Sequence, residues 1–469
     1  MRDSRETKGL NCTGQSNLQL IIPLVVVILV LLSIAIMIPS LSTTKTIGLV
    51  IGLVIFVISF TSTEIALYIL IFSMLLSPEF IVGATEGASL GRGVTLRLDD
   101  FILIIIGFSW LAKMSINKEL GLFLKTPLNT PIACYIIICL VSTLFGSLFG
   151  RVQIKTGFFF VLKYFEYMII YFMVINHLKS KKQVRNYLWA MLITCAIVSL
   201  LAMSQIPGGG RVTAPFEGVS GEPNTLGGYL VLMISVTSGL LLVSASFRDR
   251  LIYGVLIIFF SIPLVYTQSR SSYLAIIPAI MTFIFLSEKR NLVIVAVVLI
   301  GLSLPFIAPR IAKERISYTF IQGRDRMDTI EIGDLKLDTS TSARIASWKT
   351  ASKDWIKHPF LGYGVTGYRF VDAQYFRVMT ETGFIGLISL FFLIATVFKR
   401  AHNTFKKSID IFEKGLSMGF LAGFVGLLFH AVGANTFIIV RIMEPFWFMT
   451  AMVVLVPELR EDTSKAIKP

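Results

Sequence analysis

Two arginines in otherwise apolar stretches are the first residues whose type and position could do chemistry. Only 15% of the 469 residues are charged and 55% are hydrophobic, so an isolated charge stands out. Arg270 lies in YTQSRSSYLA (266–275), and Arg211 lies in the irregular stretch QIPGGGRVTAPFEGVSGEPNTLGGYL (205–230). A charge close to a bilayer is costly and marks a functional position. Because a guanidinium binds phosphate through two parallel hydrogen bonds, both arginines predict a site for a phosphorylated substrate.

Four carboxylates are candidates for proton transfer at such a site. Glu217 and Glu222 occur in the same irregular stretch as Arg211. Asp372 and Glu381 flank the point at which the chain enters another apolar run. Each of the four could act as a general base or orient a sugar hydroxyl, and Asp372 is our first choice for the base.

Four further polar residues belong to the candidate site or to a cavity beside it. Arg344 and Tyr375 occur in the polar segment before the apolar run at residue 380, and we expect them to help bind the phosphorylated group. Arg441 and Glu444 are three residues apart in the last apolar run, so they share one helix face. They are predicted to pair with each other or to line a polar cavity between helices.

Patterns for nucleotide or metal binding do not accompany these residues. The sequence has no Walker motif, no dinucleotide fingerprint and no CxxC pair, and its four histidines lack the spacing of metal ligands. We therefore expect neither a metal nor a cofactor. Since a pyrophosphate already carries the free energy for group transfer, the predicted substrate needs no ATP.

The elements that position these residues are predicted to be membrane-spanning helices. A soluble chain carries about 25% charged residues, so this composition rules out an ordinary soluble enzyme, a disordered protein and a disulfide scaffold. Apolar runs of roughly spanning length number about fourteen, with a range of 12–14 because the second and third are short. The runs are 18–38, 46–60, 63–77, 100–114, 128–148, 155–177, 184–205, 225–246, 250–268, 271–287, 290–308, 380–398, 413–433 and 437–457.

The distribution of Lys and Arg predicts the orientation. With both termini in the cytoplasm, about 22 Lys and Arg fall in inside loops and tails, against about seven in the short outside loops. This bias accounts for the larger part of the net charge of +15, so nucleic acid is not needed as a partner. The expected setting is the bacterial inner membrane, with membrane lipids around the helices.

One long segment separates two groups of spans and is predicted to face outside. The expected organisation is eleven helices in 1–308, a large external loop at 309–379, and three helices with a cytoplasmic tail in 380–469, all within one membrane domain. Loops of this length are uncommon unless they have a role. Within this loop, residues 342–357 are predicted to form a helix with Trp348 and Trp355 on one face.

Several motifs together resemble those of the bacterial O-antigen ligase and polymerase superfamily, which are membrane glycosyltransferases that use undecaprenyl-pyrophosphate sugars. The matching stretches, in this order, are RVTAPFEGVSGEPNTLGGYL (211–230), SRSSYLA (269–275), SARIASWKTASKDWIKHPFLGYG (342–364) and YFRVMTETGFIGL (375–387). The large loop between the eleventh and twelfth predicted spans fits the same plan.

The resemblance implies an all-α, GT-C-like membrane fold in which lipid-linked donor and acceptor meet at the outer leaflet. It also implies that Arg211 and Arg270 bind the donor pyrophosphate. Family ligases carry a His-Asn pair where this chain has Asp372-Ala373-Gln374-Tyr375, which favours a polymerase of repeat units for O-antigen, capsule or exopolysaccharide. The implied partners are undecaprenyl-pyrophosphate-linked glycans and a chain-length regulator protein. Two alternatives stay open, a ligase that transfers glycan to lipid A core or protein, and a flippase or exporter of lipid-linked units.

Overall fold

Helices form nearly all of the described structure. The computed structural model describes residues 43–83, 94–116, 124–217, 221–307, 331–332, 335–336 and 339–459. The first predicted span, 18–38, and much of the large loop lie outside these residues. Within the described ranges the strands form two short antiparallel hairpins, β1 (Glu79–Gly83) with β2 (Val94–Arg97) and β3 (Glu331–Ile332) with β4 (Leu335–Lys336). The predicted all-α class is therefore confirmed for the described part of the chain.

The chain divides into two compact units, and the first is small. It comprises residues 1–70 and 99–124. Its described part holds α2 (Thr43–Thr61), most of α3 (Thr63–Leu76) and α4 (Leu98–Ile116). Within this unit the Lys113 ammonium donates to the Thr63 hydroxyl at 3.4 Å. The unit contains none of the candidate site residues.

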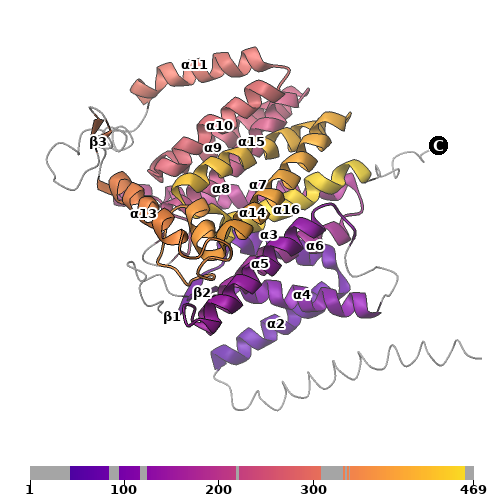
Figure 1. The fold of residues 1–469 in the computed structure, drawn as a ribbon. Helices are drawn as coiled ribbons and strands as arrows, with labels where there is room; N and C mark the ends of the chain where they lie inside the picture. Colours follow the sequence, from indigo (N-terminus) through magenta and orange to yellow (C-terminus); the bar gives the residue numbers. More distant parts are fainter. Residues whose placement is uncertain are drawn as a thin grey trace, which may run out of the picture. The chain divides into compact units, whose positions relative to one another are not determined.

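The second unit comprises residues 71–98 and 125–469 and holds all of the candidate site residues (Figure 1). Its longer helices are α5 (Asn129–Leu148), α6 (Ile154–His177), α7 (Lys181–Met203), α8 (Pro223–Val243), α9 (Phe247–Tyr266), α10 (Arg270–Leu286), α11 (Arg290–Ile307), α13 (Thr339–Trp355), α14 (Gln374–Lys407), α15 (Ile411–Gly433) and α16 (Val440–Leu455). Three short 3₁₀ helices follow α7, α15 and α16, namely η3 (Ile206–Gly208), η5 (Thr436–Ile438) and η6 (Val456–Glu458).

Every apolar run predicted from residue 46 onward coincides with a helix. Eight helices in the described ranges are long and apolar enough to cross a membrane. They are α5, α6, α7 with η3, α8, α9, α14, α15, and α16 with η6. Shorter apolar helices include α3 and α10. The chain is therefore a multi-pass membrane protein, and the total of about fourteen spans stays a prediction.

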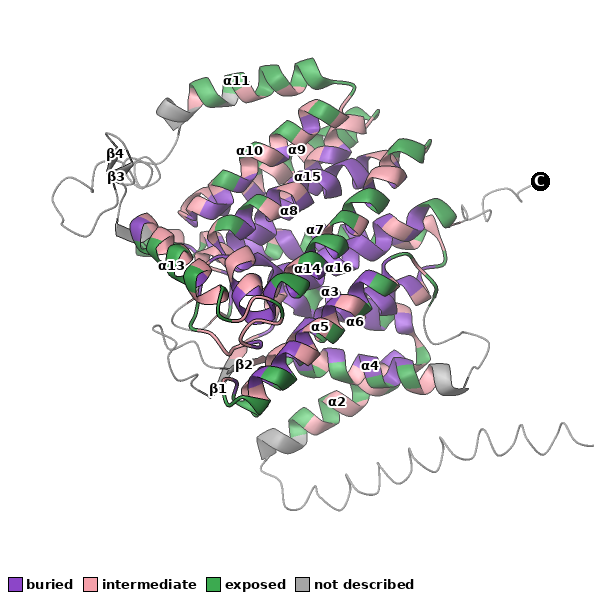
Figure 2. Ribbon diagram, in the orientation of Figure 1, coloured by how far each residue is buried: buried purple, intermediate pink, exposed green. Residues whose placement is uncertain are grey.

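Helix α15 lies at the centre of the second unit. It packs against α8, α10 and α14, which lie beside it in Figure 1. Figure 2 shows α8, α15 and α16 mostly in the colour of buried residues. A helix that is apolar all round is expected to be surrounded by other helices, as these three are.

Glycines allow the close contact between α8 and α15. A Cβ on Gly239 would lie 2.4 Å from the carbonyl oxygen of Gly415 and 2.5 Å from the amide nitrogen of Gly419. A Cβ on Gly419 would lie 2.7 Å from the carbonyl oxygen of Ser235. The two backbones thus touch without side chains between them, which is how small residues permit helix packing in membranes.

Helix α9 has an exposed apolar stripe that is suited to lipid. Leu251, Val255, Ile258 and Ile262 are spaced at three and four residues, and between 39% and 68% of each is exposed. This spacing places the four side chains on one face of the helix. A face of this kind is stable in a bilayer, because lipid tails cover it.

Helix α14 is broken at Gly383, and a loop fills the break. Gly383 has a φ of 67°, which is non-helical. The amide of Phe384 donates to the Pro359 carbonyl at 2.7 Å, and the amide of Gly364 donates to the Glu381 carbonyl at 2.8 Å. The loop 358–364 therefore satisfies backbone groups that the broken helix leaves without intrahelical partners. The span predicted at 380–398 begins earlier, at Gln374, because the segment before the break is also helical.

The candidate residues lie at one end of the second unit, where some helices end and others begin. This end, which we call the polar end, is formed by the C-termini of α7, α9 and α15 and the N-termini of α8, α10, α14 and α16. Helix α13 packs on α14 there through Ala351, Val371 and Ala373. The helix predicted at 342–357 is thus confirmed as α13.

The contact between α8 and α15 predicts a large difference between two glycine substitutions. Gly419→Ala forces the two backbones apart, and we expect it to lower the free energy of unfolding by about 1–3 kcal/mol. Gly254→Ala in α9 is the matched control, because nothing lies within 4 Å of its Cβ position. It should leave stability unchanged or raise it slightly, since alanine favours helix. Thermal unfolding of the purified variants in detergent measures both, and equal unfolding temperatures would contradict the packing described.

Candidate functional site

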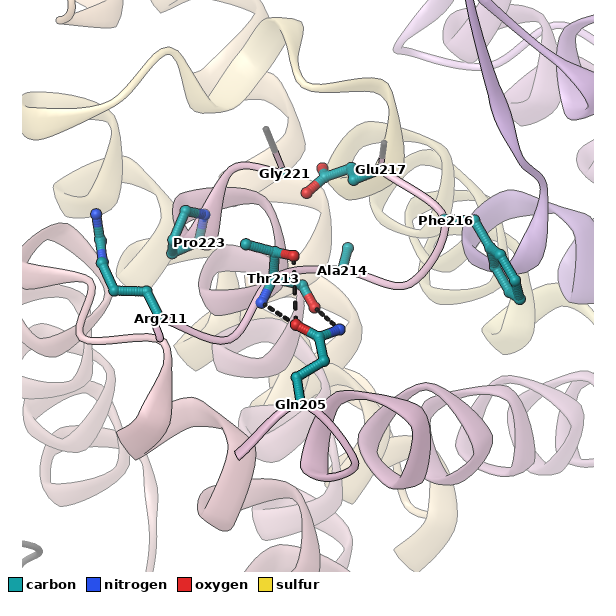
Figure 3. A pocket seen from close by; sticks show the side chains of 8 residues that line it. All are labelled: Gln205, Arg211, Thr213, Ala214, Phe216, Glu217, Gly221 and Pro223. Carbon is teal, nitrogen blue, oxygen red and sulfur yellow. Dashed lines mark hydrogen bonds between the residues drawn. The ribbon is translucent and has the colours of Figure 1, made fainter. Parts of the chain in front are cut away.

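The loop between α7 and α8 positions Arg211. The Gln205 side chain holds this loop, because its amide donates to the Thr213 carbonyl and its oxygen accepts from the Thr213 amide, both at 3.1 Å (Figure 3). Arg211 donates from Nε to the Thr267 carbonyl at 3.1 Å and from Nη2 to the Gln268 carbonyl at 3.3 Å. The guanidinium is therefore oriented on the turn between α9 and α10.

Arg270 is the first residue of α10, directly after that turn. Ser269 caps the helix, and its hydroxyl accepts from the Ser272 amide at 3.2 Å. Arg270 donates from Nη1 to the Thr341 hydroxyl at 3.4 Å, at the start of α13. Since Arg211 bonds carbonyls two and three residues before Arg270, the structure brings the two predicted arginines to the same turn. The N-terminus of α10 adds a partial positive charge there.

Arg344 and Asp372 form an ion pair on the α13 side of the polar end. Arg344 Nη2 lies 2.9 Å from Asp372 Oδ2, and 27% of each side chain is exposed. Trp348 stacks on Phe376 with ring centroids 5.2 Å apart, which fixes α13 against the start of α14. Because Thr341 is one helical turn before Arg344, the Arg270 contact and the ion pair share one short stretch of α13.

A cavity of about 650 Å³ opens beside the Arg211 loop. Figure 3 shows its lining residues, with Arg211 and Glu217 on either side of Pro223 and Thr213. The lining residues are Gln205, Arg211, Thr213, Ala214, Phe216, Glu217, Gly221 and Pro223. A guanidinium and a carboxylate thus face one space that is large enough for part of a sugar phosphate.

Burial changes the acidity of Glu217, which is half-buried at this cavity. Loss of solvation raises the pKa of its carboxyl to about 7, although the nearby Arg441 and the Glu222 amide act in the opposite direction. The Glu222 amide donates to Glu217 Oε2 at 2.8 Å. A carboxylate with a pKa near the working pH is well suited to accept and release a proton.

Arg441 acts as a buried clamp beneath the same loop. Its Nη1 donates to the carbonyls of Leu75 and Pro215, at 3.0 and 2.7 Å. Its Nη2 donates to the carbonyls of Ser77 and Phe216, at 3.0 and 3.3 Å. Only 1% of Arg441 is exposed. The guanidinium therefore ties the end of α3 to the backbone on which Glu217 is carried.

Arg441 and Glu444 each form an ion pair with a residue of the hairpin of β1 and β2. Arg441 Nε lies 3.4 Å from Glu79 Oε1, and Glu444 Oε2 lies 3.9 Å from Arg97 Nη2. The prediction considered these two residues as a mutual pair or as a polar lining. The structure adds cross-links to β1 and β2 and gives Arg441 a role in holding the loop.

Glu381 and Tyr375 make contacts elsewhere on α14. Glu381 Oε1 accepts from Arg377 Nε at 3.0 Å and from the Thr366 amide at 3.2 Å, and only 5% of the residue is exposed. The Tyr375 hydroxyl donates to the Leu428 carbonyl of α15 at 2.7 Å. Both side chains therefore hold α14 to its neighbours.

Hydrogen bonds connect Glu222 to the N-terminus of α10. Asn224 links Glu222 to the cap of α10, because its amide donates to Glu222 Oε1 at 3.1 Å and its oxygen accepts from the Ser269 hydroxyl at 2.7 Å. Helix α8 begins at Pro223, before the predicted start at residue 225.

Among the described residues there is no group of three His, Cys, Asp or Glu placed to hold a metal ion.

Sequence reasoning missed two parts of the arrangement. It did not identify Gln205, whose amide is needed to shape the loop of Arg211. It also passed over His430, which is fully buried in α15 and bonds Ser272. A polar residue alone inside an apolar span was the available signal, because such residues are rare in membranes and usually have a partner.

The clamp predicts that Arg441 cannot be replaced by lysine. Lysine keeps the charge but lacks the planar fork that reaches four carbonyls, so Arg441→Lys leaves buried acceptors without donors. We expect the free energy of unfolding to fall by about 2 kcal/mol or more. Arg248→Lys, at an exposed position at the start of α9, is the control and should be neutral. Thermal unfolding in detergent compares the two, and an unaffected Arg441→Lys protein would rule out the clamp.

Part of the chain that carries the candidate site matches a known protein family. The family model described as O-antigen ligase matches residues 254–405, which include Arg270, Arg344 and Asp372. A search of curated proteins finds no match. The matched region contains α10, α11 and α13 and most of α9 and α14. The match confirms the resemblance seen in the motifs: over residues 254–405 the chain is similar to the O-antigen ligase family.

Proposed function

We propose that the protein is a polymerase of undecaprenyl-pyrophosphate-linked oligosaccharide repeat units, for O-antigen, capsule or exopolysaccharide. The growing glycan on its lipid pyrophosphate is the donor, and a sugar hydroxyl of a fresh lipid-linked unit is the acceptor. The reaction takes place at the outer leaflet of the bacterial inner membrane, with both termini of the chain in the cytoplasm. A chain-length regulator protein is a further proposed partner.

The observation that carries the proposal is the cavity shared by Arg211 and Glu217 beside the N-terminus of α10. Arg211 bonds the turn that leads directly into Arg270. We propose that these two guanidinium groups and the N-terminal amides of α10 bind one anion. A pyrophosphate fits this set of donors. As the glycosidic bond to the donor phosphate breaks, the same groups stabilise the negative charge that develops on the leaving lipid pyrophosphate.

Glu217 is the general base in this proposal. It takes the proton of the acceptor hydroxyl, the hydroxyl oxygen bonds to the anomeric carbon, and the bond from that carbon to the pyrophosphate oxygen breaks. A single displacement of this kind inverts the anomeric centre. Support comes from the position of Glu217 at the cavity and from its pKa of about 7. Asp372 is the second candidate, because its carboxylate is held by Arg344.

A ligase is the second candidate function, favoured by the description of the matching family model. It would use the same donor site and transfer the finished glycan to lipid A core or to a protein. In place of the His-Asn pair of family ligases the chain has Asp372-Ala373-Gln374-Tyr375, where Gln374 is fully buried and accepts from the Phe437 amide at 2.9 Å. That structural use of the position supports the polymerase.

The proposal predicts products from lipid-linked repeats alone. Purified protein given only undecaprenyl-pyrophosphate-linked repeat units should form a ladder of longer lipid-linked glycans, separated by gel electrophoresis. Arg270→Lys should abolish the long chains at equal protein level, because the charge stays but the bidentate geometry is lost. Arg248→Lys is the matched control and should give the normal ladder.

Other outcomes identify the alternatives. A product that forms only when lipid A core or an acceptor protein is added would identify a ligase. Movement of intact lipid-linked units across a vesicle membrane, with no elongation, would identify a flippase. Normal chain length in Arg270→Lys would contradict the assignment of the pyrophosphate site.

The base assignment predicts a specific pH dependence. Because the base must be deprotonated, activity should rise with pH through about 7, where the pKa of Glu217 lies. Glu217→Gln should lower the turnover rate by about 10²–10⁴ and remove this rise. Initial rates of undecaprenyl pyrophosphate release between pH 5 and pH 9, at saturating donor and acceptor, measure the profile.

Asp372→Asn provides the comparison for that profile. If Glu217 is the base, Asp372→Asn should keep the rise near pH 7 even where the overall rate is lower. A profile that loses its rise in Asp372→Asn but keeps it in Glu217→Gln would assign the base to Asp372.

A further inference from the structure

An unbroken chain of hydrogen bonds runs from the proposed site into the core of the second unit. Its links from Glu222 through Asn224 to Ser269 measure 3.1 and 2.7 Å. The Ser269 and Ser272 hydroxyls are 2.7 Å apart, and Ser272 lies 3.2 Å from Nε2 of His430. Nδ1 of His430 lies 2.8 Å from the Thr436 hydroxyl, which ends the chain.

The direction of each hydrogen bond from Asn224 to His430 follows from the Glu222 end of the chain. The Glu222 carboxylate only accepts, so the Asn224 amide donates to it and the Asn224 oxygen accepts from Ser269. A hydroxyl has one proton, so Ser269 must accept from Ser272, and Ser272 must then accept from His430.

His430 therefore carries a proton on Nε2, and because the ring is fully buried we infer that it is the uncharged tautomer. The lone pair on Nδ1 accepts the proton of the Thr436 hydroxyl. All five donors therefore point in one direction, toward Glu222. Because no member of the chain can reverse its bond alone, the network fixes the tautomer of the histidine and the rotamers of the two serines together.

The surrounding helices are shaped to hold this histidine. His430, Ser269, Ser272 and Thr436 all have 0% exposure. A Cβ on Gly228 of α8 would lie 3.3 Å from Cε1 of His430, so the adjoining backbone confines the ring. An imidazole packed this closely has little freedom to turn, which makes it a rigid support.

The same end of α15 is also tied to the segment that carries Asp372. The side-chain amide of Asn435 donates to the Val371 carbonyl at 2.9 Å, and the backbone amide of Phe437 donates to the side-chain oxygen of Gln374 at 2.9 Å. Thr436, the partner of His430, lies between these two residues. His430 and the residues that follow α15 therefore contact both the start of α10 and the start of α14.

We propose that His430 is a positioning residue of the site, whose Nε2–H donor fixes the Ser269 cap, and through Asn224 the Glu222 side chain, in the geometry that transfer needs. This inference rests on the proposed function only in that glycosyl transfer is the readout. Glu222 neighbours the base, because its own amide donates to Glu217. His430 touches neither substrate nor the reacting atoms, and it acts through the cap of α10 and the start of α8.

Two substitutions of His430 separate positioning from simple packing. In His430→Gln the side-chain amide reaches the place of Nε2 and can donate to Ser272. In His430→Asn the shorter amide occupies the place of Nδ1 and leaves Ser272 without its donor. We expect His430→Asn to lower kcat about tenfold or more with KM for the lipid-linked donor nearly unchanged, and His430→Gln to recover most of the rate.

A pair of serine substitutions tests the same link from the other side. Ser272→Ala removes the acceptor of His430 and should resemble His430→Asn. Ser417→Ala is the matched control, because Ser417 is also fully buried but bonds only within its own helix, to the Glu413 and Lys414 carbonyls of α15. It should turn over at the wild-type rate.

The assay measures release of undecaprenyl pyrophosphate from the lipid-linked donor, with repeat units and lipid A core both present as acceptors, so it reports transfer by either a polymerase or a ligase. Thermal unfolding of each variant is measured beside it. Equal kcat in His430→Gln and His430→Asn, or a loss of unfolding temperature with unchanged kcat, would overturn the positioning role. Absence of release by the wild-type protein would instead overturn the proposed function.

Discussion

A buried polar group in an apolar bundle needs a partner inside the protein, and this constraint governs the polar end of the second unit. The hydrocarbon core of a bilayer holds no water to satisfy exposed amides and carbonyls. Irregular backbone at residues 211–217 is stable because Arg441 bonds two of its carbonyls and Gln205 bonds both backbone groups of Thr213. The same rule applies at the break in α14, where the loop 358–364 supplies the missing bonds. Each irregular segment that a site requires is thus accompanied by a dedicated polar support.

Hydrogen bonds between helices also require that the helices pack closely, and glycines make this close packing possible. Gly227 and Gly228 lie in the motif NTLGGYL at the start of α8. A Cβ on Gly227 would lie 2.0 Å from the Ser272 hydroxyl, so α8 could not approach α10 with any larger residue there. The glycines between α8 and α15 repeat this arrangement deeper in the bundle. The motif therefore has a structural role, because its glycines set the distance at which the hydrogen-bonded chain can form.

The positions of the helices, and the placement of Arg211 and Arg270 at one turn, could be predicted from the sequence. The hydrogen-bond partners of the buried polar side chains could not. Hydropathy located the helices from residue 46 onward, because apolar length is a local property. The bonds of Arg441 to Leu75 and Pro215 join residues more than 200 positions apart, and no local pattern specifies them. Glu381, which stands near Asp372 in sequence, is occupied by Arg377 and the Thr366 amide. The spacing of four residues between Arg377 and Glu381 is a local helical pattern, so this pair could have been predicted from the sequence. The start of α14 at Gln374 was missed because polar residues interrupt the apolar run there.

The manner in which each arginine is held bears on what it can do. Arg344 and Arg377 are bonded to carboxylates, Asp372 and Glu381, which balance their charge. The recorded bonds of Arg211 are to backbone carbonyls of the turn before α10. A hydrogen bond to a backbone carbonyl orients a guanidinium, so an arginine held in this way is fixed in direction. Fixed orientation matters because a donor that need not reorganise during the reaction stabilises a leaving pyrophosphate more effectively than a mobile one. The bonds of Arg211 to the Thr267 and Gln268 carbonyls therefore fix its direction relative to the start of α10.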